Sequence, residues 1–281
     1  MVDRTDPIHR RISDFQTRVY LHYEREGRDL PWRKTTDPYK ILVSEVMLQQ
    51  SQVSRVVEKY QMFIRLFPDP ESLAHAPLHN ILSAWQGMGY NRRALSLKKS
   101  AQRIREFHSG MVPEDEESLL SLPGIGVATA RAIQAFAFNK PVILIETNIR
   151  AVFIHPFFPE HIKVPDSAIY PLVARTLDAA DSRKWYNALM DYGVHLKKLY
   201  GNPARLSAHY RRQAPFKGSI RQARGAILRV ILEKMTISEG NLMEALSLEA
   251  DQLSHILKTL EAEGLIVNRG GLISIAQRSP R

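Results

Sequence analysis

The chain has 281 residues, no cysteine and a formal charge of +10. The length predicts two domains, and the lack of cysteine excludes disulfides, thiolate zinc sites, cysteine nucleophiles and cysteine-ligated iron–sulfur clusters. Hydrophobic residues make up 44 % of the chain, too many for a disordered protein, and no apolar run reaches the ~18 residues of a membrane span. The N-terminus has no apolar signal core, so we expect a cytoplasmic protein, and the basic charge favours nucleic acid as its partner.

The first 218 residues are predicted to be helical almost throughout. Apolar side chains recur at helical spacing, and proline or glycine residues end several of these runs. The predicted helices span residues 53–67, 78–85, 94–107 and 127–138, and a further one begins near Ile149. We therefore expect an all-α core over residues 1–213 with two helical subdomains. One comprises residues 30–138, and the other pairs residues 1–29 with 139–213.

A second domain is expected over residues 219–281, after a boundary near Arg212 to Ser219. Three amphipathic helices precede two short apolar runs that flank Asn268–Gly271, a hairpin signal. This order predicts a winged-helix-like domain. In a DNA-binding protein its third helix would read bases, but this helix carries four acidic residues that repel phosphate. A protein contact or an orienting role fits it at least as well.

Residues 197–229 hold nine lysines and arginines and no acidic residue. That density could neutralise several phosphates. We favour a phosphate-contacting segment over a solvated linker. The candidate DNA contacts in it are Lys197, Lys198, Arg211 and Arg212.

The segment Leu122–Gly126, with the sequence LPGIG, joins two helical runs. Its glycines allow a tight turn with exposed backbone amides at a helix N-terminus, which can bind a phosphate, often with a cation on the carbonyl side. Such a turn alone is usually a plain connection, but its flanks match the helix-hairpin-helix pattern. It predicts sequence-independent anchoring of DNA. The candidate contacts are Leu122, Gly124, Ile125, Gly126, Ala128 and Thr129.

Two glutamates stand beside apolar runs. Glu45 lies in the helical run VSEVML, and Glu146 follows VILI and precedes the next helix. Each has an ordinary explanation: Glu45 as a solvent-facing residue, and Glu146 as an acid that stabilises a helix N-terminus. Beside a DNA-binding hairpin, the pair also fits N-glycosidic hydrolysis, in which one acid protonates the leaving base and an ionised carboxylate stabilises the oxocarbenium-like sugar. The apolar surroundings favour Glu45 as the acid and Glu146, in a more polar site, as the stabiliser.

Six short segments occur in collinear order between about residues 8 and 225. They are LPWR (30–33), DPY (37–39), SEVMLQQSQV (44–53), WxGxGY (85–90), LPGIG (122–126) and MDxG (190–193). Together they resemble the helix-hairpin-helix DNA glycosylases of the endonuclease III superfamily, most closely the A/G-specific adenine glycosylase (MutY) branch. The segment SEVMLQQ is specific to that branch.

The resemblance implies roles for individual residues. Glu45 matches the acid that protonates the purine, and the target nucleotide would be flipped out of the stack. Gln49 and Gln50 match residues that fill the gap in the duplex or contact the opposite base. Arg33 and Tyr90 match residues of the base pocket or the opposite-base contact.

Four departures accompany the resemblance. Glu146 stands where the family has aspartate, and Ala128 stands where lyase members carry the lysine that forms a Schiff base, which implies a monofunctional enzyme. Lys197 occupies the place of the first cluster cysteine. The winged-helix-like segment replaces the larger C-terminal domain that recognises 8-oxoguanine. With Asn91 in place of a tyrosine that the family often has, this change argues against 8-oxoguanine recognition.

We therefore predict a monomeric, monofunctional DNA glycosylase of base excision repair, acting on double-stranded DNA with a mispaired or damaged base. The first expectation is removal of adenine opposite guanine or 8-oxoguanine. The alternatives are removal of thymine or uracil opposite guanine, and a non-catalytic DNA-binding module. No cofactor or catalytic metal is required, and a monovalent cation at the hairpin would serve DNA binding. Glu45 and Glu146 are expected to face a cleft between the two helical subdomains.

Overall fold

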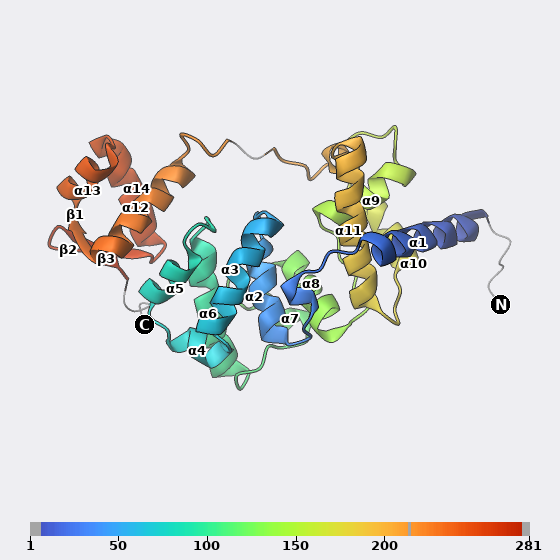
Figure 1. Cartoon of the computed structure of the whole chain (residues 1–281), viewed down its shortest axis with the longest axis horizontal. Coiled ribbons are helices and arrows are strands. Elements are labelled where there is room, and N and C mark those ends of the chain that lie inside the picture. Colours follow the sequence, from blue (N-terminus) through green and yellow to red (C-terminus); the bar gives the residue numbers. More distant parts are fainter. Residues whose placement is uncertain (1–6, 213–214, 277–281) are drawn as a thin grey trace. The chain divides into compact units, whose positions relative to one another are not determined.

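The computed structural model describes residues 7–212 and 215–276 (Figure 1). The ends of both predicted domains (1–6, 213 and 277–281) and residue 214 of the predicted boundary lie outside the described residues. The chain packs as two units. The first unit comprises Met1–Ile41, Glu114–Leu120 and Gly126–Arg212, and the second comprises Leu42–Pro113, Ser121–Ile125 and Gln213–Arg281. This division groups residues 30–41, 114–120 and 126–138 with the first unit, whereas the sequence pattern groups them with the middle segment.

The first unit is built around α11 (Ser182–Tyr200). This helix contacts α1 (Pro7–Glu26), α8 (Val127–Phe138) and α9 (Thr147–Phe157), which gather around it in Figure 1. Trp185 is fully buried in its core and meets the ring of Phe15 edge-on at 6.1 Å. The remaining elements are η1 (Pro31–Arg33), α7 (Glu116–Leu120), α10 (Asp166–Thr176) and η2 (Pro203–Leu206).

The second unit begins inside α2 (Pro38–Leu48), a helix that is apolar on nearly every side. It continues with α3 (Val53–Leu66), α4 (Pro70–His75), α5 (Leu78–Trp85) and α6 (Arg92–Phe107). Lys98 of α6 is buried, and its ammonium donates to the carbonyl oxygens of Ala74 at 2.6 Å and Ala76 at 2.7 Å. These bonds satisfy the buried charge and fix the end of α4 against α6.

The C-terminal part of the second unit, drawn in orange to red in Figure 1, has the order helix, strand, helix, helix, strand, strand. Its elements are α12 (Ile220–Lys234), β1 (Thr236–Ser238), α13 (Glu239–Leu246), α14 (Ala250–Ala262), β2 (Ile266–Arg269) and β3 (Leu272–Ile275). The strands form an antiparallel sheet in the order β1-β3-β2. The three helices and the hairpin lie where the sequence predicts them, and β1 is an addition that the sequence did not predict.

Local sequence explains where these C-terminal elements begin and turn. Ser219 and Ser238 cap α12 and α13, because each side chain accepts a bond from the backbone amide three residues later. In the hairpin, Gly270 and Gly271 have positive φ angles of 60° and 83°, which only glycine adopts without strain. The domain rests on α5, where a ring nitrogen of His79 lies 3.2 Å from the carbonyl oxygen of Leu232.

The mostly helical core with a small C-terminal sheet confirms the predicted fold class. The predicted helices 78–85 and 127–138 match α5 and α8 residue for residue. Among the described residues, no helix combines the length and the apolar character that a membrane crossing requires.

Candidate active site

Glu45 lies on α2, where the neighbouring side chains are almost completely excluded from solvent. Leu42, Val43, Ser44 and Val46 are each no more than 2 % exposed, and Glu45 itself is half-buried. A helix that is apolar on nearly every side has to bury its surface all round. Glu45 is therefore a carboxyl group at the edge of an apolar core, not a residue on an open polar face.

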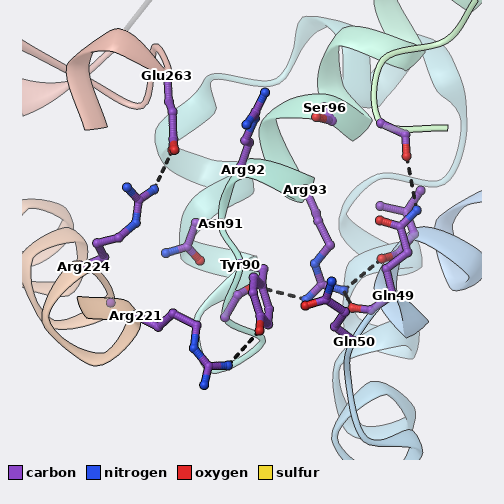
Figure 2. A pocket seen from close by; sticks show the side chains of 14 residues that line it. Gln49, Gln50, Tyr90, Asn91, Arg92, Arg93, Ser96, Arg221, Arg224 and Glu263 are labelled. Atoms are coloured by element: carbon purple, nitrogen blue, oxygen red, sulfur yellow. Dashed lines mark hydrogen bonds and ion pairs between the residues drawn. The ribbon is translucent and has the colours of Figure 1, made fainter. Parts of the chain in front are cut away.

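Three residues expected to contact bases, Gln49, Gln50 and Tyr90, line one pocket of about 510 Å³ in the second unit (Figure 2). Gln50 and Tyr90 have positive φ angles of 53° and 47°, an unfavourable conformation for residues with a side chain. Backbone strain of this kind persists where the surrounding structure enforces it, often at functional sites.

Arg93 binds the backbone next to both of these residues. Its guanidinium donates to the carbonyl oxygens of Val46 and Met47 at 2.9 Å each and of Gln49 at 2.5 Å, and to that of Gly89 at 3.2 Å. It also lies 5.6 Å from the centre of the Tyr90 ring. Burial lowers the pKa of Arg93 to about 10, so it remains charged at neutral pH. One half-buried cation thus joins the end of α2 to the loop before α6.

The hairpin is fixed to the same unit through its carbonyl oxygens. Gln49 donates to the carbonyl of Gly124 at 3.2 Å, and Ser100 donates to that of Pro123 at 2.8 Å. Gly124 has a φ of +83°, and a Cβ there would lie 2.8 Å from the Cβ of Ser96. Both the turn and the close approach therefore require glycine. The side chains of Leu122 and Ile125 are buried, so only their backbone groups remain to meet a phosphate.

In the first unit, Glu146 is the N-cap of α9. Its Oε1 accepts bonds from the amide N–H groups of Asn148 at 2.6 Å and Ile149 at 3.1 Å. The residue thus folds back on its own helix, as the ordinary explanation from the sequence predicts. Burial raises the pKa of Glu146, while the two amide donors and the ammonium of Lys197 oppose that rise. The sequence predicts polar surroundings for Glu146. The upward shift of its pKa on burial differs from that prediction.

Helix α11 holds the segment around Glu146 at several points. The hydroxyl of Tyr186 donates to the carbonyl of Val142 at 2.6 Å and accepts from the amide of Leu144 at 3.0 Å. Further along α11, Lys197 donates to Oδ1 of Asn148 at 2.7 Å. Lys197 is half-buried, and burial lowers the pKa of its ammonium. Its charge therefore lies inside the first unit beside Glu146, a placement that the sequence did not indicate.

The MDxG segment (residues 190–193) contacts both Asn148 and Arg33. The thioether of Met190 accepts a weak bond from the Asn148 amide at 3.7 Å, and a Cβ on Gly193 would lie 2.7 Å from the Asn148 carbonyl oxygen. Asp191 is buried and binds the guanidinium of Arg33 through both carboxylate oxygens at 2.8 Å. Arg28 adds an ion pair at 2.6 Å. The segment therefore positions both Asn148, two residues after Glu146, and the LPWR segment.

This arrangement places the guanidinium of Arg33 on Asp191, with a further contact over the ring of Tyr23 at 5.9 Å. Its base-pocket role stays a prediction. Burial alone would raise the pKa of Asp191, but the bonds from Arg33 and Arg28 outweigh it and lower that pKa.

The remaining predicted DNA contacts are spread over the first unit. Lys198, Arg211, Arg212 and the hairpin residue Gly126 are exposed, and Thr129 is half-buried. Ala128 is exposed on the wall of a hollow of about 550 Å³ that Ile145 and the Arg150–Asp166 ion pair also line. No amine stands at that position.

The family model described as "HhH-GPD superfamily base excision DNA repair protein" matches residues 43–168. The adenine DNA glycosylase of Mycolicibacterium smegmatis is 32 % identical over 264 residues, which cover 87 % of this chain and 89 % of the relative. That of Mycobacterium tuberculosis strain H37Rv is 43 % identical over 149 residues, 53 % of this chain and 48 % of the relative. The chain spans about half the length of the first curated relatives it matches.

Among solved structures, a thermostable thymine-DNA glycosylase is similar in fold, with a TM-score of 0.60 and 26 % identity. The match covers 67 % of this chain and 88 % of that one. The sequence motifs, the helical core and these relatives agree: the chain belongs to the HhH-GPD superfamily of base excision DNA repair proteins, and within it to the adenine DNA glycosylase family.

Proposed function

We propose that this protein is a monofunctional DNA glycosylase that excises adenine mispaired with guanine or 8-oxoguanine in double-stranded DNA. The observation that carries the proposal is the placement of Glu45 on an apolar helix that leads directly into Gln49 and Gln50. In the same unit, Gln49 is bonded to the hairpin that would hold the DNA backbone. The named adenine DNA glycosylases among its relatives support the choice of base.

In this mechanism the bond between C1′ of the sugar and the base nitrogen breaks, and its electron pair leaves with the base. Glu45 gives its proton to a ring nitrogen of the purine, which makes the base a better leaving group. Ionised Glu146 stabilises the positive charge that develops on the sugar, and water then adds to C1′ and releases a proton. The amide bonds at the α9 N-terminus and the charge of Lys197 favour the ionised form of Glu146.

Ala128 supports the monofunctional assignment. A lyase needs an amine that attacks C1′ and forms a Schiff base, and this position offers only a methyl group. The reaction should therefore end at an intact strand with an abasic site.

A monovalent cation at the hairpin would bind carbonyl oxygens of the turn. Those of Pro123 and Gly124 already accept one bond each, and a carbonyl oxygen has a second lone pair to offer. A cation held there would stabilise the turn that binds phosphate and would take no part in bond cleavage.

The direct test is single-turnover excision from labelled duplexes containing A opposite guanine, A opposite 8-oxoguanine, T opposite guanine or U opposite guanine. Each reaction is read with and without alkali. We expect cleavage of the adenine strand only after alkali. Excision of T or U alone would favour the second candidate, which the similarity to a thymine-DNA glycosylase supports. No excision with tight binding retained would favour the non-catalytic module.

A duplex substrate also implies a role for the exposed basic side chains. The exposed Lys198, Arg211 and Arg212 would contact phosphates and contribute to binding of any duplex. The protein would act as a monomer. It would act in the cytoplasm, together with the DNA. Analytical ultracentrifugation with and without duplex tests the monomer.

A further inference from the structure

Two helices of the first unit bring three potential metal ligands together. His22 and Glu26 lie four residues apart near the end of α1, and His195 lies on α11. Each side chain offers one ligand atom, and these three atoms all lie within 4.8 Å of one another. The two histidines are half-buried, and the glutamate is exposed. We call these three residues the His–Glu cluster.

The cluster is built on helices that are held against each other. Helix α1 packs directly on α11. Shortly after α1 ends, Arg28 binds Asp191 of α11 twice, through its backbone amide at 2.8 Å and its guanidinium at 2.6 Å. The spacing of four residues places His22 and Glu26 on the same face of α1. Ligands carried by packed helices are positioned more precisely than ligands carried by loops.

The two imidazole rings lie close together. The ring centres of His22 and His195 are 4.3 Å apart, with a tilt of 44° between the rings. The ring of Tyr192, one turn before His195, lies 5.5 Å from that of His22 and 6.0 Å from that of His195. Ring packing alone accounts for these three aromatic side chains. It does not account for a carboxylate beside both imidazoles, which Glu26 supplies.

Two imidazole nitrogens and one carboxylate oxygen are a typical ligand set for Zn²⁺, with bonds of about 2.0–2.2 Å. Ligand atoms around a tetrahedral ion with such bonds lie about 3.4 Å apart, so the cluster has to contract by at most about 1.5 Å. The exposed side chain of Glu26 is free enough in space to make that movement. We propose that His22, Glu26 and His195 bind one Zn²⁺ ion, which fixes α1 on α11. Water can take the fourth position.

The ion would act on the stability of the first unit and not on bond cleavage. Helix α11 also carries Tyr186 and Lys197, which hold the segment around Glu146. In the unfolded chain the two histidines are far apart along the sequence, so zinc binds the folded state in preference and stabilises it. The inference therefore does not rest on the proposed function.

The test uses the full chain, freed of metal by a chelator, and titrates it with ZnCl₂ in a calorimeter. We expect one Zn²⁺ per chain. Changes outside the ligand shell already weaken metal sites about 10–100-fold, so His22→Ala and His195→Ala should each weaken binding at least about 100-fold. At a zinc concentration of about 100 times Kd, the Tm of the intact chain should rise by about 5 °C. The Tm of both variants should stay unchanged at that concentration.

Two further variants make the result specific. Glu26→Gln removes the carboxylate at an exposed position, so it should keep the fold and still weaken zinc binding. His155→Ala is the matched control, because His155 is also half-buried in the first unit and stacks on Tyr200 at 4.5 Å, outside the cluster. This variant should bind zinc as tightly as the intact chain. Circular dichroism confirms that each variant is folded.

Two results would overturn the proposal. One is an intact chain that shows no saturable binding of one ion. The other is a set of cluster variants, Glu26→Gln included, that bind zinc with the Kd of the intact chain, which places the ion elsewhere on the protein.

Discussion

Replacing Gly193 by alanine should destabilise the protein although alanine is the better helix former. In an open helix interior, alanine in place of glycine stabilises by about 1 kcal/mol. At Gly193 the new methyl group would lie 2.7 Å from the carbonyl oxygen and 2.8 Å from the Cβ of Asn148, distances that force a backbone shift. Overpacking of this kind costs about 1–3 kcal/mol. The expected net effect is a loss of up to about 2 kcal/mol.

Gly225 provides the matched control for stability. It lies inside α12, where a Cβ would meet nothing within 4 Å, so Gly225→Ala should stabilise by about 1 kcal/mol. Urea unfolding followed by far-UV circular dichroism gives both values. The shift at Gly193 should also displace Asn148, and with it Glu146, so single-turnover excision should slow. The reasoning is refuted if Gly193→Ala stabilises as much as Gly225→Ala and excision is unchanged.

Asp191→Asn should lower the free energy of unfolding in urea by about 3–5 kcal/mol, because it leaves buried arginine charge without its carboxylate. The pKa of Asp191 in the folded protein lies below its ordinary 3.8. The stabilisation is therefore present above pH 3.8 and is lost as the pH falls through the pKa of the folded state. Lys197→Met should raise the pKa of Glu146 further and move the acid limb of the excision rate to higher pH, whereas an unmoved limb would show that Lys197 does not act on Glu146. Borohydride should trap no covalent adduct with DNA, since Ala128 offers no amine, and a trapped adduct would contradict the monofunctional assignment.

Local patterns predicted the elements well, because helix periodicity and turn residues act over a few positions. The apolar spacing and the flanking glycines placed α5 and α8 at their observed bounds. The three-residue β1 escaped prediction because a strand that short carries no alternation to recognise, and its hydrogen bonds go to β3, far along the chain.

Contacts between distant residues could not be predicted in the same way. The pairing of Arg33 with Asp191 joins residues 158 positions apart, and the bond from Lys197 to Asn148 spans 49. The sequence identified Lys197 as basic and therefore assigned it to DNA, whereas the fold turns it inward. Glu146 shows a different limit: the sequence offered a helix cap or a catalytic carboxylate as alternatives, and the geometry makes it a cap while leaving it available as the proposed stabiliser.

The central claim, that Glu45 is the acid of a DNA glycosylase, is tested most directly by one paired measurement on Glu45→Gln. Single-turnover excision of adenine opposite guanine and Kd for the same duplex are measured on one preparation. General acid catalysis is worth about 10²–10⁴-fold, so excision should fall at least 100-fold. Kd should stay within a few-fold of its original value. Excision that persists near the original rate would contradict the account.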